Sequence, residues 1–458
     1  MEQSIGSWAE EEFGASRLGD ERRTRRLVQL ASGAASAVGA ALSGVCGRSG
    51  AQAVSRLLDC SEATLESVTK PHVMQTTKRC VGHGRVLAIQ DTTVLDFSTH
   101  HAVEGIGPVS HLAHNRGLLM HSVLCVDENR VPLGILGLQI WARKDSERGS
   151  AKKVKRPASA KESRKWLVGL DQAQQQFPAS QRVLVVGDRE SDLYALFVAP
   201  RRAGVDLLVR LAHNRNVASE EYSSVREALA GASELGIYEV EIPRQGSRPK
   251  RIAQLGVRAA HVRLCAPVWS RSSGTRADVD VSVVWAKELQ APATGTSLDW
   301  TLLTTEIVTS FETAVDMVRC YSARWVIEEF HRVLKSGCRV EQMQFDTVER
   351  IKPAVGILAV VAWRVLHLTK YARSEPTPDV SMVANTQEVE VLRRWLISQG
   401  DKSAQIRTAR DFNVAVARLG GFLGRKSDGM PGTKTTWQGL RNLEVLVLGY
   451  KLAAQHEM

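Results

Sequence analysis

Two short apolar runs, each followed within two residues by an aspartate, constrain the fold of this chain most. Residues 86–89 lead to Asp91, and residues 183–186 lead to Asp188. Runs of this length and composition predict buried strands. Each strand would carry a carboxylate at its C-terminal end, and active sites of open α/β sheets collect at that edge. One aspartate in such a place is more often a helix cap than a ligand, so the interpretation depends on the pair.

A third acidic residue lies in the stretch 321–335, which contains no Gly or Pro and is predicted to form one helix. Four polar residues fall on one face of that helix: Tyr321, Arg324, Glu328 and Lys335. One carboxylate between two cations and a phenol suits a metal-binding acid flanked by groups that hold phosphates. The alternative is an amphipathic helix with a solvated charged face, and an isolated stripe favours that alternative.

Composition narrows the class of protein. The chain has 458 residues, which is enough for two or three domains, and its net charge of +11 indicates a polyanionic partner, with nucleic acid as the first choice. The seven cysteines are odd in number and form no Cys-x-x-Cys motif, so we expect reduced thiols rather than a zinc site. A polar, acidic start predicts no signal peptide, and the absence of an apolar run near ~18 residues predicts no membrane span. We therefore expect a cytoplasmic protein.

Residues 1–70 are predicted to form a helical, basic N-terminal domain. Asp20 is placed to cap a helix that begins at Glu21. That helix carries three arginines on one side: Arg22, Arg23 and Arg26. A DNA-binding face and a solvated face explain them equally well. A second helix is predicted over 52–58, after a turn marked by Gly44, Gly47 and Gly50.

Residues 71–373 mix strand and helix signals and predict an α/β core. Further strands are expected at 121–126 and 133–141, and the Lys-, Arg- and Ser-rich segment 144–165 predicts a mobile basic loop. Residues 205–305 favour strands and predict a β-rich insertion between Asp188 and Glu328.

The chain after residue 310 is predicted to be helical. An apolar helix is expected from Pro353 to Arg373, followed by a Pro-rich break at 375–378. Residues 387–458 are predicted to form a helical C-terminal domain.

Three carboxylates on two strands and a helix suit a particular chemistry. Such a trio binds two Mg²⁺ or Mn²⁺ ions ~4 Å apart, and Mg²⁺ prefers oxygen ligands, so no His or Cys cluster is needed. This arrangement breaks and joins phosphodiesters. A glycosidase also uses two acids, but the basic charge of the chain argues against that alternative.

The spacing Tyr321-x2-Arg324-x3-Glu328-x6-Lys335 resembles the Y-x2-R-x3-E-x6-K signature of the Tn-five-like DDE insertion-sequence transposases, in the bacterial IS-four group. The resemblance covers nearly the whole chain, with similar segments at 18–20, 89–93, 188–190, 327–331 and 417–422. It implies an RNase H-like (retroviral integrase-like) catalytic core at 71–373 with a β-strand insertion at about 205–305. It also implies a transposon-end DNA-binding domain at 1–70 and a dimerisation domain at 387–458.

The resemblance further implies a reaction and a set of residue roles. The reaction is cut-and-paste transposition: terminal-repeat binding, Mg²⁺-dependent nicking, hairpin formation and opening, and strand transfer into target DNA by a homodimer. The implied metal ligands are Asp91, Asp188 and Glu328. The implied DNA contacts are Tyr321, Arg324 and Lys335 at the phosphate of a flipped base, Trp300 as its stacking surface, Arg210 at a phosphate, and Arg22, Arg23 and Arg26 at the transposon end.

Alternatives remain at this level. Without the resemblance, Trp300 is a core or sheet-packing residue. Ser36 stands where related sequences have Lys, so the end sequence that is recognised should differ. An inactive transposase-derived DNA-binding protein and a stand-alone metal-dependent nuclease are the competing functions. The intact acidic trio argues against the first of them.

Overall fold

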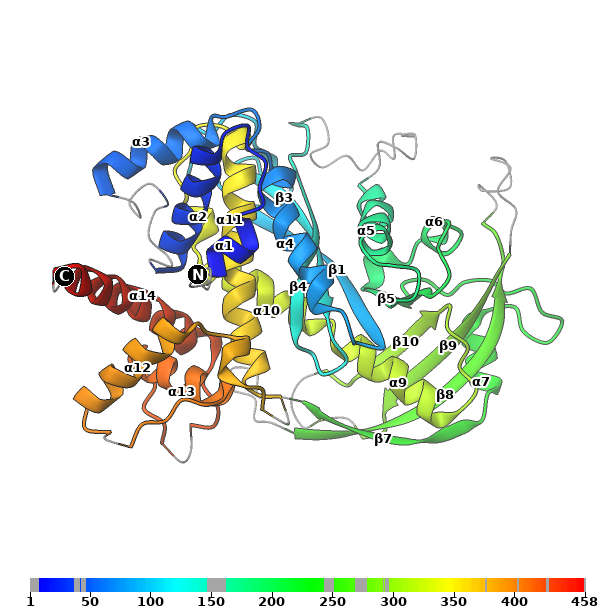
Figure 1. Ribbon diagram of the computed structural model, residues 1–458. Coiled ribbons are helices and arrows are strands. Elements are labelled where there is room, and N and C mark those ends of the chain that lie inside the picture. The colour runs from blue at the N-terminus through cyan, green and yellow to red at the C-terminus, as the bar shows by residue number, and fades with distance from the viewer. Residues whose placement is uncertain are drawn as a thin grey trace. The chain divides into compact units, whose positions relative to one another are not determined.

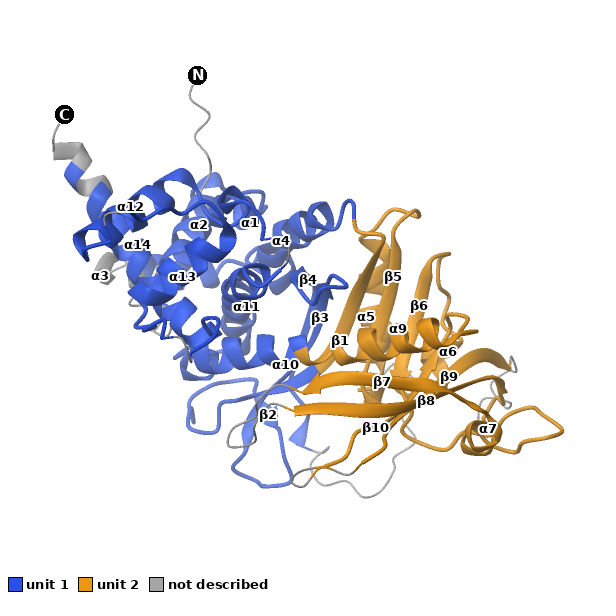
Figure 2. Cartoon of the chain, turned by 90° about the horizontal axis from the view of Figure 1, so that it is seen from below, with its two compact units in different colours: residues 1–82, 92–154, 326–458 blue, residues 83–91, 155–325 orange. Residues whose placement is uncertain are grey.

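The computed structural model describes residues 8–36, 42, 47–145, 162–242, 251–267, 278–290, 292, 296–374, 377–401, 403–425 and 428–456. The chain forms two compact units (Figure 2). Unit 1 contains residues 1–82, 92–154 and 326–458, and unit 2 contains residues 83–91 and 155–325. The predicted mixture of helices and strands is confirmed.

Unit 2 is built on one twisted sheet (Figure 1). Its strands, in spatial order, are the first half of β1 (Arg85–Asp96), then β5 (Arg182–Gly187), β6 (Val205–Arg210), β10 (Asp299–Thr304), β9 (Val279–Glu288), β8 (Arg251–Leu264) and β7 (Glu234–Ile242). β1, β5 and β6 are parallel, and every later neighbour is antiparallel. The strands expected in 205–305 are therefore confirmed.

Helices cover the sheet of unit 2. α9 (Phe311–Ser322) lies across the strands β6 to β10. α5 (Arg164–Gln175) packs on β5, and a Cβ at Gly169 of this helix would lie 2.3 Å from Gln90 Oε1, so a larger residue there would displace the Gln90 side chain. The short helices α6 (Tyr194–Phe197) and α7 (Val225–Gly231) complete the unit. The strand β5 is buried along nearly its whole length, as the parallel strands of α/β proteins are.

Unit 1 is organised around α11 (Val348–Tyr371), whose 24 residues are mostly buried. Around α11 pack α2 (Glu21–Ser36), α3 (Gly47–Leu58), α4 (Leu65–Arg79), β4 (Pro132–Trp141), α13 (Ala409–Leu419) and α14 (Thr433–His456). The unit also contains α1 (Trp8–Phe13), β2 (Gly107–Pro108), β3 (Arg116–Val126), α12 (Thr386–Ser398) and, except for its first residue, α10 (Trp325–Arg332). By length and composition α11 could cross a membrane, but 89% of its most apolar window is buried in the fold, as in a core helix.

Several predicted boundaries are confirmed. Asp20 precedes α2, and its Oδ1 accepts the N–H of Arg22 at 2.8 Å. The strands β3 and β4 pair as an antiparallel hairpin, and Arg130 takes a positive φ of 66° in their turn. The C-terminal domain is helical, with α12, α13 and α14.

Other boundaries were wrong. α3 begins at Gly47, so Gly47 and Gly50 lie in the helix rather than in a turn. α11 begins at Val348, and Pro353 lies inside it, where the missing N–H removes only one helical hydrogen bond. The burial of α11 on every side outweighs this loss. Residues 146–161 of the predicted basic loop, and residues 375 and 376 of the Pro-rich break, lie outside the described residues.

A buried polar network fixes α1 in unit 1. Ile135 donates its N–H to His72 Nε2 at 2.9 Å, so Nδ1 carries the proton and donates to Glu12 Oε2 at 2.5 Å. Arg79 Nη1 donates to Glu12 Oε1 at 2.6 Å, and its guanidinium lies 4.2 Å from the centre of the Trp363 ring. Burial opposes ionisation of Glu12, but His72 and Arg79 outweigh it and lower the pKa of Glu12 to about 2. The imidazole is neutral because burial lowers the pKa of His72, so Arg79 balances the charge of Glu12.

We expect Glu12→Gln to lower the free energy of unfolding at pH 7 by roughly 3 kcal/mol, the low end for breaking a buried ion pair. Because the folded-state pKa of Glu12 is depressed, its stabilisation is complete above about pH 4.5 and is lost as the pH falls towards 2. Urea unfolding followed by circular dichroism at pH 7, 4.5 and 3 should therefore show a shallower acid loss in Glu12→Gln. Glu66→Gln, at an exposed position of α4, is the control. Equal pH slopes in Glu12→Gln and wild type would contradict the assignment.

Candidate active site

Asp91 and Asp188 occupy equivalent positions on two neighbouring parallel strands of unit 2. The last paired residues of β1 and β5 are Ile89 and Val186, and each aspartate follows its paired residue by two positions. The parallel register therefore brings both carboxylates to the same edge. The prediction that Asp91 ends its strand was wrong, because β1 continues to Asp96. Its pairing with β5 nevertheless ends at Ile89, just before Asp91.

Asp188 caps a short helical turn. Its Oδ1 accepts the N–H of Glu190 at 2.9 Å, at the start of η3 (Arg189–Ser191). A Cβ at Gly187 would lie 2.3 Å from Ser191 Oγ, so the turn that presents Asp188 requires a glycine. Burial raises the pKa of Asp188, although the N–H of Glu190 acts in the opposite direction. The surroundings thus compensate the negative charge of this carboxylate incompletely, which favours a cation beside it.

Arg324 lies beside the first aspartate. Its Nη1 is 3.9 Å from Asp91 Oδ2, and the two side chains are 12% and 18% exposed. A guanidinium at this distance stabilises the ionised form of the carboxylate. Among the described residues, no three His, Cys, Asp or Glu side chains come together closely enough to hold a metal ion. Two members of the predicted trio, Asp91 and Asp188, belong to unit 2 and reach the same edge of its sheet. The third, Glu328, belongs to unit 1.

The stretch 321–335 is not one helix, and this prediction was wrong. α9 ends at Ser322 and α10 begins at Trp325. At the break, the N–H of Arg324 bonds to the carbonyl of Tyr321 at 3.0 Å, an i to i−3 bond that tightens the turn. Ser322 Oγ also donates to the carbonyl of Arg319 at 2.7 Å, and such bonds compete with the helical ladder.

The four polar residues of the predicted stripe therefore lie on different elements. Tyr321 is buried near the end of α9, and Arg324 lies in the break. Glu328 is exposed on α10. Lys335 lies in a π-helical turn, η4 (Val333–Gly337), with its Nζ 3.1 Å from Glu341 Oε1.

Trp300 lies in the core of unit 2. Its side chain is 4% exposed, and it packs edge to face against Tyr321, with ring centres 5.3 Å apart, and against Trp325, at 6.2 Å. This is the packing environment that the core interpretation expects. The contact of Trp300 with Trp325 was not predicted from the sequence, although an aromatic residue directly after Arg324 could have indicated it.

The remaining candidates lie on α2 and at the end of β6. Arg22 is exposed on α2, and Arg26 is partly buried. Arg23 is tied locally, because its Nη1 donates to the carbonyl of Leu18 at 2.9 Å and lies 3.3 Å from Glu62 Oε2. Arg210 ends β6 and donates from Nη2 to the carbonyl of Asp299 at 2.9 Å.

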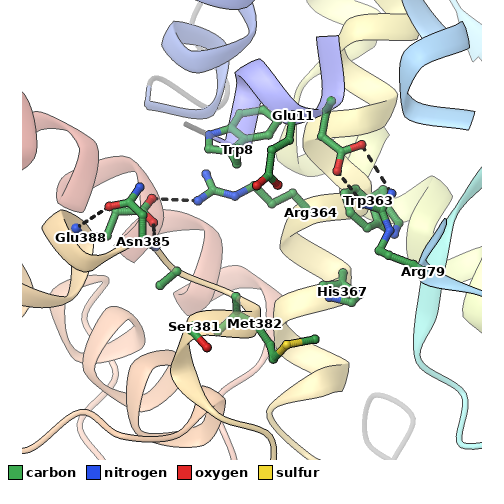
Figure 3. A pocket seen from close by; sticks show the side chains of 13 residues that line it. Trp8, Glu11, Arg79, Trp363, Arg364, His367, Ser381, Met382, Asn385 and Glu388 are labelled. Atoms are coloured by element: carbon green, nitrogen blue, oxygen red, sulfur yellow. Dashed lines mark hydrogen bonds and ion pairs between the residues drawn. The ribbon is translucent and has the colours of Figure 1, made fainter. Parts of the chain in front are cut away.

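A pocket of about 150 Å³ in unit 1 contains none of the predicted site residues (Figure 3). Trp8 of α1 and Trp363 and Arg364 of α11 line it, together with residues around the start of α12. The guanidinium of Arg364 lies 4.6 Å from the centre of the Trp8 ring, and its Nη2 donates to Glu388 Oε1 at 2.9 Å. These side chains hold α1, α11 and α12 together, so we interpret the pocket as a packing junction.

Three family models match the chain, and all of them describe transposases. The model for transposase DNA-binding matches residues 5–62. The model for the transposase DDE domain matches 146–363, a range that includes Asp188 and Glu328 and begins after Asp91. The model for the transposase Tn5 dimerisation domain matches 360–457.

Among solved structures, the chain is similar to a piggyBac transposase in a synaptic complex with hairpin DNA. The TM-score is 0.37 and the identity 9%, over 95% of this chain and 81% of that chain. The family models confirm the resemblance stated from the sequence. Matched in order by DNA-binding, DDE and Tn5 dimerisation models, the chain belongs to the Tn5-like DDE transposases.

Proposed function

We propose that this DNA transposase carries out cut-and-paste transposition of an insertion sequence. Asp91, Asp188 and Glu328 would hold two Mg²⁺ or Mn²⁺ ions in each active site. The observation that carries the proposal is the parallel register of β1 and β5, which brings Asp91 and Asp188 to the same edge of the sheet in a chain of the DDE family. The nick, the hairpin, its opening and strand transfer would all use this one site.

The strand order of unit 2 supports an RNase H-like core. Three neighbouring parallel strands, β1, β5 and β6, stand at one end of the strand order in the sheet of unit 2. Along the chain, the antiparallel strands β7 to β10 follow β6 and precede the segment that bears Glu328, as a β-strand insertion would. The insertion thus extends the catalytic sheet rather than forming a sheet of its own.

The residues present fit a hard divalent cation. Carboxylate oxygens are the ligands that Mg²⁺ prefers, and the burial of Asp188 leaves a negative charge for a cation to balance. Bound metal would supply activation of the attacking oxygen and stabilisation of the leaving oxygen. Asp188 is held in place by its own cap hydrogen bond, and Arg324 Nη1 lies 3.9 Å from Asp91 Oδ2.

The basic and aromatic candidates would bind DNA. Arg324 and Lys335, with Tyr321, would hold the phosphate next to a flipped base, and Arg210 another phosphate. Trp300 would receive the base after its packing against Tyr321 and Trp325 opens. Arg22, Arg23 and Arg26 of α2 would read the terminal inverted repeats, and the C-terminal helices would form the homodimer in the paired-end complex. An inactive DNA-binding descendant and a stand-alone nuclease are the rival functions.

A cleavage assay on cognate transposon ends tests the proposal. Asp91→Ala, Asp188→Ala and Glu328→Ala should each abolish cleavage but leave end binding nearly intact, because DNA affinity comes mostly from basic side chains. Glu329→Ala is the matched control, since it removes a neighbouring carboxylate of α10 that pairs with Lys370 at 2.7 Å. Substantial cleavage by any of the three variants would remove that residue from the site. Nicking without hairpins in wild type would favour the nuclease.

The metal requirement gives a second test. Mg²⁺ and Mn²⁺ should support cleavage, whereas Ca²⁺ should support end binding with little turnover, because its looser coordination misplaces the reacting oxygens. Gel analysis of products in each metal, with excess EDTA as the control, measures this. Cleavage that persists in EDTA would rule out metal-dependent chemistry.

Trp300 tests the base-flipping step. We expect Trp300→Ala to nick normally but to form hairpins roughly ten- to a hundredfold more slowly, because ~1–3 kcal/mol of base stacking is lost. Single-turnover kinetics on end DNA, with a fluorescent base analogue at the flipped position, separates the two steps. Trp285→Ala, at a half-buried tryptophan of β9, is the control. An equal loss of nicking and hairpin formation, with a lower melting temperature, would show that Trp300 acts only by core packing.

A further inference from the structure

Two adjacent polar residues interrupt an otherwise apolar strand in unit 1. β3 is buried from Gly117 to Val126, and His121 and Ser122 are the polar side chains in that stretch, both with 0% exposure. Burying polar groups in this way costs free energy unless they are hydrogen-bonded. Successive residues of a strand point to opposite faces, so the two side chains serve different neighbours.

Each of the two contacts a segment that bears a proposed metal ligand. His121 Nδ1 lies 2.9 Å from Thr92 Oγ1, and Thr92 directly follows Asp91 in β1. Ser122 Oγ lies 3.1 Å from His331 Nε2, and His331 is three residues after Glu328 in α10. All four contacting residues belong to unit 1.

α10 depends on such contacts for its orientation. The helix has only eight residues, and it begins after the break at Arg324 and ends in the π-helical turn η4. Its apolar side is buried through Val326, Ile327 and Phe330. Apolar packing is non-directional, whereas a hydrogen bond fixes both distance and angle. The bond between Ser122 and His331 therefore restricts rotation of α10 about its axis in a way that packing alone does not.

The imidazole is suited to a fixed structural bond. Burial, with a smaller effect of Lys335, lowers the pKa of His331 to about 3, so the ring is neutral at any working pH. A neutral ring has one donor and one acceptor nitrogen, and the hydroxyl of Ser122 can satisfy Nε2 in either role. The contact thus persists across the pH range in which the protein works.

We propose that Ser122, acting through His331, is a positioning residue for Glu328. The contact sets the rotation of α10 and so the direction in which Glu328 presents its carboxylate. This inference rests on the proposed function, in which Glu328 is a metal ligand. Residues that orient a ligand from behind typically change metal affinity by 10- to 100-fold when they are replaced.

The test measures metal affinity rather than turnover. Mn²⁺ binding is titrated by electron paramagnetic resonance on the full-length protein assembled with already cleaved end DNA and no target DNA. We expect Ser122→Ala to raise the half-saturating Mn²⁺ concentration about tenfold. Ser122→Thr, which keeps the hydroxyl, should restore the wild-type value.

Cys125→Ala is the matched control. It also removes one heavy atom from a buried side chain of β3, but Cys125 contacts Cys80 Sγ, at 3.4 Å, rather than α10. Its melting temperature should fall about as much as that of Ser122→Ala, with unchanged Mn²⁺ affinity. Should Ser122→Ala not fold, Ser122→Cys, which keeps a weaker donor, takes its place with the same expected direction.

Two outcomes would overturn the inference. If Ser122→Ala binds Mn²⁺ as tightly as Cys125→Ala, the contact only stabilises the fold. If Glu328→Ala binds Mn²⁺ as wild type does, Glu328 is not a ligand, and the proposed function fails together with this inference. The first result leaves the proposed function standing, so the two failures can be told apart.

Discussion

The parallel pairing of β1 with β5 is the constraint on which the proposed site depends. A shift of one residue in the register of two strands turns every side chain of one strand to the other face. Such a shift would separate Asp91 from Asp188, although both strands would keep their apolar character. In the observed register Ile89 pairs with Val186, within stretches of β1 and β5 that are almost wholly buried. The geometry of the proposed site thus depends on strand pairing that ends two residues before each aspartate.

Polar residues are buried in β1 and β3, where apolar side chains are expected. Gln90 is fully buried beside Gly169 of α5, and His121 and Ser122 interrupt β3. A strand that only had to fill a core would carry apolar residues at these positions. Local choices that conflict with the fold concentrate at functional sites. All three residues lie next to, or contact, segments that carry Asp91 or Glu328.

The buried parts of the strands could be predicted from the sequence, whereas several helix boundaries could not. The apolar run 183–186 identified β5 because a strand buried on both faces is continuously apolar, with no polar residues at alternate positions. The stretch 321–335 has helical periodicity, but the break at Arg324 comes from i to i−3 hydrogen bonds, which periodicity does not report. Pro353 lies within a helix because burial of α11 outweighs local propensity. Two separate apolar runs, each followed by an aspartate, led us to expect Asp91 and Asp188 at the same edge of a sheet. The register that relates their two strands was visible only in the structure.

The packing of α11 bears on whether the end-binding segment is a separable domain. α2, α3 and α4, which contain or follow the matched DNA-binding region, pack on the same helix as α13 and α14 of the matched dimerisation region. Met74 lies inside α4, so a chain that begins there would lose the first nine of the fifteen residues of α4, and with them His72 and its contact with Glu12. It would also uncover apolar side chains of α11 that α2 and α4 now bury. Exposed apolar area of this kind costs about 25 cal/mol per Å². Loss of end binding in such a chain would therefore reflect damage to all of unit 1 as well as the loss of Arg22, Arg23 and Arg26, and single arginine substitutions are needed to separate the two causes.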